Sequence, residues 1–288
     1  MNLIPATDPS AFARTTAGAV AEHLADLADR LEARPSLTPA PEVDALFGDL
    51  VRTVVRTPAA TARAVLADPR VQRRAASLRA SSARGESALE QAWARRITAA
   101  ADPRAELRAF PYADNYRRLV RLELAALAPH HHEPVRSVAV LGSGPLPLTA
   151  FAYADRLSAE VVGVDVDPVA TEAARRVATL SGPGGVRLEV GDAADVDLRA
   201  HDVVVLAALV GTTTAEKATL AARLATRMRP GALLLLRSAR GLRTLLYPAV
   251  RTSTLRGFTV LEVVHPTDDV INSVVVARAG SPRERLWA

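Results

Sequence analysis

A glycine turn and an aspartate carry the clearest chemical information in this sequence of 288 residues. The apolar run at 138–141 ends in Gly142-Ser143-Gly144-Pro145, and a second apolar run at 161–164 ends in Asp165. Small residues let a backbone approach a ligand closely, and a carboxylate at the end of the next strand accepts hydrogen bonds from ribose hydroxyls. The pattern predicts a site for an adenosine-type ligand.

Pro145 narrows the choice of ligand. A pyrophosphate is bound by free N–H groups at the start of a helix, and proline has no N–H to donate. We therefore predict S-adenosylmethionine, which carries no phosphate, in place of a dinucleotide. The alternative is a nucleotide-fold domain with a different ligand.

Two further strand ends are expected to line the same crevice, because ligands in open α/β sheets bind at the carboxyl ends of the strands. Asp192 follows the predicted strand 186–190 and is placed to meet an adenine amino group. Ala207, Ala208 and Leu209 follow the predicted strand 202–207 and are small enough to floor the pocket. An ordinary turn and simple packing are the alternatives for these two segments.

Acidic and aromatic residues in the first half of the chain form a second candidate set. Glu86 and Glu90 are four residues apart, so they share one face of a helix. Tyr112, Asn115 and Tyr116 lie around a helix break at Pro111. The alternatives are a solvated helix face and core packing.

The segment 130–133, His-His-His-Glu, is the one metal-like motif. Consecutive side chains cannot all face one ion, and the chain has no cysteine to complete a zinc site. We interpret it as a solvated linker and expect no metal.

The elements that must position these residues fall into two parts. Apolar residues recur at helical spacing through 1–128, including Ser87–Ala100 and Glu106–Ala128, which predicts a helical N-terminal domain on the acceptor side that acts as a lid. Strands and helices alternate over 129–288. Strands are predicted at 137–142, 160–165, 186–190, 202–207, 232–237, 258–264 and 273–278, and helices at 147–157, 168–180, 214–228 and around 241–249.

This alternation predicts an α/β fold. The predicted strands and an antiparallel pair at one edge resemble the Rossmann-like, seven-stranded sheet of SAM-dependent methyltransferases. We expect that sheet with an N-terminal all-helical domain.

Composition limits the classes of function. The absence of cysteine excludes disulfides and thiolate chemistry. The net charge is +5, but acids are interspersed with arginines and no basic run with aromatics appears, so we expect no nucleic-acid partner. No signal peptide or membrane-length apolar run is found. We expect no membrane partner and a cytoplasmic location.

Several longer phrases resemble nicotianamine synthases. Those at 230–248 and 265–274 are unusual, and ordinary methyltransferases lack them. The resemblance covers about residues 86 to 278 and is carried by the phrases at 86–90, 110–116, 142–149, 165–168, 206–211, 230–248 and 265–274.

The resemblance implies that the 3-amino-3-carboxypropyl arm of S-adenosylmethionine is transferred to a small amine or an amino acid, with release of methylthioadenosine. Relatives of this kind make metallophore precursors. Other relatives cyclise S-adenosylmethionine to azetidine-2-carboxylate and use no acceptor. A methyltransferase and a non-catalytic S-adenosylmethionine-binding protein remain alternatives. The oligomeric state is open, with a homodimer as one option.

Roles for the second candidate set follow from this chemistry. The attacking amine must lose a proton, and Glu90 is the first candidate for the base, with Glu86 the second. Tyr112 and Tyr116 are candidates for positioning the donor arm, and Asn115 for contacting substrate. Arg237, after the fifth strand, is a candidate for holding a substrate carboxylate or for a structural role.

One residue departs from the family pattern. Ala113 stands where the family has a second consecutive tyrosine. This difference, with the compact chain, favours a bacterial-type enzyme that makes one transfer or one cyclisation.

Overall fold

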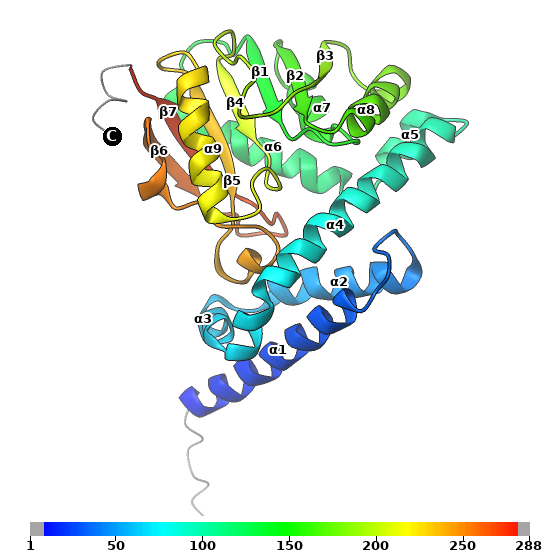
Figure 1. The fold of residues 1–288 in the computed structure, drawn as a ribbon, viewed down its shortest axis with the longest axis vertical. Helices are drawn as coiled ribbons and strands as arrows, with labels where there is room; N and C mark the ends of the chain where they lie inside the picture. Colours follow the sequence, from blue (N-terminus) through cyan, green and yellow to red (C-terminus); the bar gives the residue numbers. More distant parts are fainter. Residues whose placement is uncertain (1–8, 282–288) are drawn as a thin grey trace, which may run out of the picture. The chain divides into compact units, whose positions relative to one another are not determined.

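The computed structural model describes residues 9–281, with side chains from residue 16 onward, and divides the chain into two compact units. Unit 1 contains the described residues up to Gly85 together with Arg240–Leu246. Unit 2 contains Glu86–Ala239 and the described residues from Tyr247 onward. Figure 1 labels the helices and strands of both units.

Unit 1 is helical. Its helices α1 (Pro9–Glu32), α2 (Pro41–Arg56), α3 (Ala59–Ala67) and the first part of α4 (Pro69–Ala99) pack through apolar faces. In α2 the buried residues Leu46, Leu50 and Val54 recur every fourth position, so one stripe of the helix is apolar. Pro41 begins α2, where its missing N–H costs no helical hydrogen bond.

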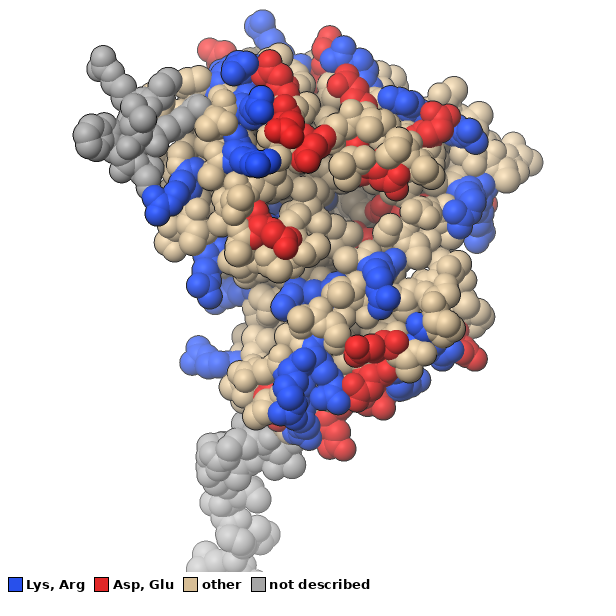
Figure 2. Space-filling view, in the orientation of Figure 1, with Lys and Arg blue, Asp and Glu red and all other residues tan. Residues whose placement is uncertain are grey.

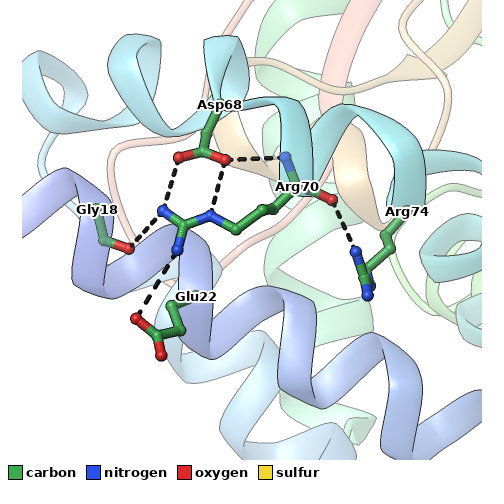
Figure 3. Close-up of polar contacts among 5 residues, drawn as sticks. All are labelled: Gly18, Glu22, Asp68, Arg70 and Arg74. Carbon is green, nitrogen blue, oxygen red and sulfur yellow. Dashed lines mark hydrogen bonds and ion pairs between the residues drawn. The ribbon is translucent and has the colours of Figure 1, made fainter.

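An ion-pair network joins α1 to the start of α4 (Figure 3). Arg70 donates from Nε and Nη2 to the carboxylate of Asp68 at 3.0 and 2.8 Å, and from Nη2 to the Gly18 carbonyl at 3.2 Å. The hydrogen bond from Arg70 lowers the pKa of Asp68 to about 2. Farther along α4, Arg74 forms a two-pronged pair with Asp29 of α1 at 2.6 and 2.7 Å.

A segment from the second half of the chain completes unit 1. The short 3-10 helix η2 (Gly241–Leu245) buries Leu242 and Leu245. Arg79 of α4 donates to the Thr244 carbonyl at 3.1 Å. Unit 1 is therefore discontinuous in sequence.

Unit 2 is built on a seven-stranded sheet of order β3-β2-β1-β4-β5-β7-β6. Successive strands are added outward from β1 in one direction up to β3 and then from β4 in the other direction. β1 and β4 both run parallel to their neighbours. β7 is antiparallel to β5 and to the edge strand β6. The strands are β1 (Ser137–Leu141), β2 (Glu160–Asp165), β3 (Val186–Val190), β4 (Val203–Leu206), β5 (Leu233–Ser238), β6 (Phe258–Val264) and β7 (Ser273–Ala279).

Helices cover both faces of this sheet. α6 (Ala113–Leu127) and α7 (Leu148–Ala154) pack on one face against Val138 and Val140. α8 (Pro168–Ser181) joins α7 through the cluster that contains Val177 and Phe151. α9 (Thr214–Arg227) packs on the other face. The remaining elements of unit 2 are α5 (Pro103–Arg108), η1 (Ala128–His130) and η3 (Thr252–Thr254).

The sequence-based predictions for the sheet are confirmed. Each predicted strand is present within one residue at either end, and the last two strands pair antiparallel at an edge. The chain breaks between α5 and α6 around Pro111, as predicted. The fold class is therefore the α/β, methyltransferase-type sheet that the sequence predicted.

One helix start and the boundary between the two units differ from the positions expected from the sequence. The helix predicted from residue 87 is the second half of α4, which begins at Pro69. Its first half was missed because the segment 69–85 is rich in arginine and buries few large apolar side chains. The contacts divide the chain after Gly85, whereas the sequence pattern changes near residue 128, because Ala94, Ile97 and Phe110 pack with α7 residues in unit 2.

Basic and acidic side chains lie interspersed on the face shown in Figure 2. Within the described residues, no helix is both long and apolar enough to span a membrane.

A buried ion pair ties α6 to the end of β5. Arg237 Nε donates to Glu123 Oε1 at 2.7 Å, and the two residues are 5% and 0% exposed. Arg237 Nη2 also donates to Thr149 Oγ1 at 3.0 Å, and Tyr153 donates to Glu123 Oε2 at 3.0 Å. Every member of the network is thus hydrogen-bonded, which a buried charge pair requires.

We predict that Glu123→Ala lowers the free energy of unfolding by about 3–5 kcal/mol, because it leaves the Arg237 guanidinium buried and unpaired. Urea unfolding followed by circular dichroism measures the change. The control is Glu172→Ala on α8, which removes an exposed pair with Arg176 and should cost less than about 1 kcal/mol. Equal costs for the two variants would contradict the prediction.

Candidate functional site

The glycine turn after β1 is held in a conformation that excludes side chains. Gly142 and Gly144 have φ angles of +77° and +66°, which residues other than glycine rarely adopt. A Cβ at Gly142 would lie 2.1 Å from Val210 Cγ2, and one at Gly144 would lie 2.7 Å from Glu90 Oε2. The turn is therefore in direct contact with the segment after β4 and with α4.

Asp165 fastens this turn to the end of β2. Its Oδ2 accepts a hydrogen bond from Gly144 N at 2.8 Å, and its Oδ1 accepts one from Asp167 N at 3.0 Å. Each carboxylate oxygen keeps a further lone pair for a ligand hydroxyl. The predicted partners Gly144 and Asp165 therefore lie together.

The other predicted donor-binding residues lie at the same edge of the sheet. Ala207 N donates to the Leu141 carbonyl at 3.0 Å, so the segment after β4 begins beside the end of β1. Ala208 is buried, and Ala207 and Leu209 are partly buried. Asp192 is exposed just after β3, with Oδ1 accepting from Ala194 N at 2.8 Å.

Ser143 and Pro145 complete the turn. Ser143 Oγ is buried without a hydrogen-bond partner. Pro145 is buried and precedes α7, which has no side-chain cap at its first turn. A buried hydroxyl without a partner is a group that a bound ligand can satisfy.

Two glutamates and two tyrosines form a hydrogen-bonded cluster next to the turn. Tyr116 donates to Glu90 Oε1 at 2.7 Å and lies 3.3 Å from Glu86 Oε1. Tyr247 donates to Glu86 Oε2 at 2.5 Å. Glu90 therefore connects the tyrosine cluster to the glycine turn, because Oε1 accepts from Tyr116 and Oε2 faces Gly144.

Burial perturbs the proton affinities of this cluster. Burial, and then the charge of Glu86, raise the pKa of Glu90 to about 8. Burial also raises the pKa of Glu86, and it raises the pKa values of Tyr116 and Tyr247 well above their usual value. The tyrosines stay protonated donors, while Glu90 changes charge near neutral pH.

Other predicted residues make different contacts. Tyr112 is 37% exposed and packs edge-on against Phe110 at 6.0 Å between ring centroids. Asn115 Nδ2 donates to the Asp269 carbonyl at 3.1 Å, which fixes the loop between β6 and β7. Arg237 is committed to Glu123 and Thr149, which favours its structural role over a substrate carboxylate.

Tyr247 was absent from the predicted site residues. Its position in the Tyr247-Pro248 end of the phrase at 230–248 was the available signal. Nothing in its local spacing relates it to Glu86, which lies 161 residues earlier in the chain. Ala113, the departure from the family pattern, is buried in the apolar cluster with Phe110 and Leu146.

The histidine segment contacts the edge strand β6 and its own backbone. His130 Nε2 lies 3.0 Å from Glu262 Oε2, and His131 Nδ1 lies 2.7 Å from the Glu133 carbonyl. Among the described residues, no group of three or more His, Cys, Asp or Glu side chains is arranged to hold a metal ion.

Comparison with known proteins places these residues in a family. The model of the nicotianamine synthase protein family matches residues 13–283. The chain belongs to the nicotianamine synthase family.

Plant members of the family match most of the chain. Nicotianamine synthase 9 of Hordeum vulgare is 40% identical over 269 residues, covering 90% of this chain and 78% of that protein. Nicotianamine synthase 2 of Oryza sativa subsp. japonica is 40% identical over 276 residues, covering 92% and 84%. The resemblance stated from the sequence phrases is confirmed.

Crystal structures of MtNAS share the fold. A mutant in complex with S-adenosylmethionine superposes with a TM-score of 0.78 and 24% identity, covering 91% of this chain and 98% of that chain. MtNAS in complex with MTA and tNA gives a TM-score of 0.80 at 22% identity, covering 90% and 98%.

We predict that the Glu90 carboxyl of this nicotianamine synthase family member titrates near pH 8, and that Glu86→Gln lowers that pKa. The substitution removes the neighbouring negative charge that opposes ionisation of Glu90. Carboxyl-carbon NMR of protein labelled at glutamate measures both values, with Glu90→Gln to assign the signal.

The same shift makes stability depend on pH. Because folding raises the pKa of Glu90 from 4.5 to about 8, the stability contributed by its protonated form is fully present below about pH 4.5 and is lost as the pH rises from there to about 8. Glu90→Gln should therefore flatten the fall in melting temperature across that range. A Glu90 signal with an ordinary glutamate pKa of about 4.3 would contradict the assignment.

Proposed function

We propose that this protein transfers the 3-amino-3-carboxypropyl group of S-adenosylmethionine to an amine and releases methylthioadenosine. The observation that carries the proposal is the position of Glu90, whose carboxylate faces Gly144 of the turn while hydrogen-bonded to Tyr116. This places a carboxylate that gains and loses a proton near neutral pH beside the expected adenosine site.

The residues around the turn fit an adenosine-bearing donor. The carboxylate of Asp165 has lone pairs for the ribose hydroxyls. Because Gly144 has no side chain, the Glu90 carboxyl can lie directly beside the turn. The partnerless Ser143 hydroxyl can donate to the donor. Pro145 and Pro147 precede α7 and have no N–H to donate, in keeping with a ligand without phosphate.

The proposed step is a displacement at carbon. The neutral amine of the acceptor forms a bond to the γ-carbon of the methionine arm. The carbon–sulfur bond breaks, and its electron pair returns to sulfur, which leaves as the neutral thioether of methylthioadenosine. The amine then carries one surplus proton, which the Glu90 carboxylate accepts.

The surroundings of Glu90 suit this role. A base is most effective when its pKa lies near the working pH, and burial holds the pKa of Glu90 at about 8. Tyr116 fixes one carboxylate oxygen by donating to Oε1, which leaves Oε2 oriented toward the turn. A sulfonium bound at the turn would favour the ionised carboxylate by its positive charge.

Glu86 has a supporting role in this proposal. Its two oxygens lie 3.3 Å from the Tyr116 hydroxyl and 2.5 Å from the Tyr247 hydroxyl, so it orients both phenols. Its negative charge also raises the pKa of Glu90. In this proposal Glu86 thus sets the pKa of the base Glu90, and Tyr116 and Tyr247 line the site of the donor arm.

The proposed acceptor is a small amine or an amino acid. The cytoplasmic location and a homodimeric assembly stay predictions from the sequence.

The coproduct tests the proposed reaction. Purified protein is incubated with S-adenosylmethionine and a panel of amino acids, and the products are analysed by mass spectrometry. We expect methylthioadenosine together with an acceptor that has gained the aminocarboxypropyl group. S-adenosylhomocysteine without methylthioadenosine would indicate methyl transfer, and methylthioadenosine formed without an acceptor would indicate cyclisation.

We predict that Glu90→Gln lowers turnover by about 10²–10⁴-fold, because an amide cannot accept the amine proton. Donor affinity, measured by calorimetry, should stay within about threefold because the Asp165 contacts are unchanged. Glu172→Gln, an exposed glutamate on α8, is the control and should leave both quantities unchanged. Full turnover in Glu90→Gln would remove Glu90 as the base.

We predict that Asp165→Ala weakens donor binding by about tenfold or more, because the ribose loses a charged acceptor and Gly144 N loses its partner. Calorimetry with S-adenosylmethionine and with methylthioadenosine measures the loss. The matched control is Asp167→Ala, which removes the α8 cap on Val169 N and should lower stability with little change in affinity. Equal affinities for wild type and Asp165→Ala would refute the ribose role.

A further inference from the structure

The only lysine of the chain is among its most buried side chains. Lys217 lies on α9 and is 1% exposed. Its ammonium donates to the Val210 carbonyl at 2.9 Å and lies 3.4 Å from the Ala207 carbonyl. Both carbonyls belong to the segment that follows β4.

The ammonium is held by carbonyl oxygens, and no ion pair with a carboxylate is seen within the described part of the chain. Burial lowers the pKa of Lys217 to about 8, because the charged form is poorly solvated there. A buried charge without a counter-ion opposes folding, and an apolar side chain of similar length would avoid that cost. Core packing alone therefore does not account for a lysine at this position.

The tethered segment bears directly on the donor site. The Val210 carbonyl accepts the hydrogen bond from Lys217. The Val210 side chain packs against the glycine turn, because a Cβ at Gly142 would lie 2.1 Å from Val210 Cγ2. Ala207 N is bonded in turn to the carbonyl of Leu141, the last residue before Gly142. The ammonium, the segment 207–210 and the turn are thus joined by consecutive contacts.

We propose that Lys217 is a positioning residue for the S-adenosylmethionine donor, acting through the segment 207–210. The tether holds this segment against the glycine turn and so sets the affinity for the adenosine part of the ligand. The inference rests on the proposed function, since it takes the turn to be the donor site. The adenosine part is common to S-adenosylmethionine and methylthioadenosine, so Lys217 acts on both.

The test compares Lys217→Met with wild type. Calorimetry should give dissociation constants for S-adenosylmethionine and for methylthioadenosine that both rise by about tenfold, because the segment loses its charged hydrogen-bond donor. The donor KM should rise in parallel. The kcat at saturating donor should stay within about twofold, because Glu90 and Tyr116 are untouched.

Leu224→Ala is the control for a merely structural role. Leu224 is fully buried on the same helix, and its truncation should lower the melting temperature while leaving donor affinity unchanged. Circular dichroism and thermal unfolding of both variants separate stability from affinity. Equal affinity losses in the two variants would overturn the proposal, because the effect would then follow stability alone.

The absence of native cysteine permits a rescue experiment on the full chain. Lys217→Cys places a single thiol in the protein, and alkylation with 2-bromoethylamine during unfolding and refolding restores an ammonium of nearly the lysine length. Alkylation with 1-bromopropane gives a neutral chain of similar size. Wild type is carried through the same treatments. The aminoethylated protein should regain donor affinity and the propylated protein should not.

Val210→Ala tests the same coupling while leaving the buried charge in place, in case Lys217→Met does not fold. It should raise the two dissociation constants in parallel by removing the methyl groups that contact Gly142.

If wild type binds S-adenosylmethionine and either Lys217→Met or Val210→Ala binds it equally well, the proposal is wrong and the proposed function stands. If wild type binds neither ligand, the proposed function itself fails.

Discussion

The hydrogen bond from Gly144 N to the Asp165 carboxylate is the contact on which the site depends. It joins the turn after β1 to the end of β2, at a glycine in a left-handed conformation with no side chain to exclude Glu90. Glu90 occupies the space that a side chain at residue 144 would fill. The backbone of the turn thereby fixes how near the Glu90 carboxylate lies to the donor site proposed at Asp165.

Two groups of charged side chains in unit 2 differ in how their charges are balanced. Glu123 and Arg237 form a fully hydrogen-bonded pair that joins α6 to β5. Glu86 and Glu90 instead accept hydrogen bonds from tyrosines, and burial raises the pKa values of both carboxyls although those hydrogen bonds lower them. Arg237 still lowers the pKa of both glutamates through its charge, so the ion pair with Glu123 influences the proton affinity of Glu86 and Glu90.

The sheet could be predicted from sequence because its strands are uninterrupted apolar runs between turns, as at Val203–Leu206. The glycine turn and Asp165 were predictable because they are close in sequence and their chemistry is local. The role of Arg237 was open, because its partner Glu123 lies 114 residues away in an unremarkable helix. The first half of α4 and the contact of Tyr247 with Glu86 were missed for the same reason: packing, and not local pattern, determines them.

Unit 1 is assembled from residues up to Gly85 and from Arg240–Leu246, whose Leu242 and Leu245 are buried within it. A ribosome that has made only the first helices has therefore not yet supplied every part of that unit. Five strands of the sheet, β1 to β5, are synthesised before η2 is available. The core of the N-terminal unit can therefore close only after most of the sheet has been synthesised, although its first helices leave the ribosome first.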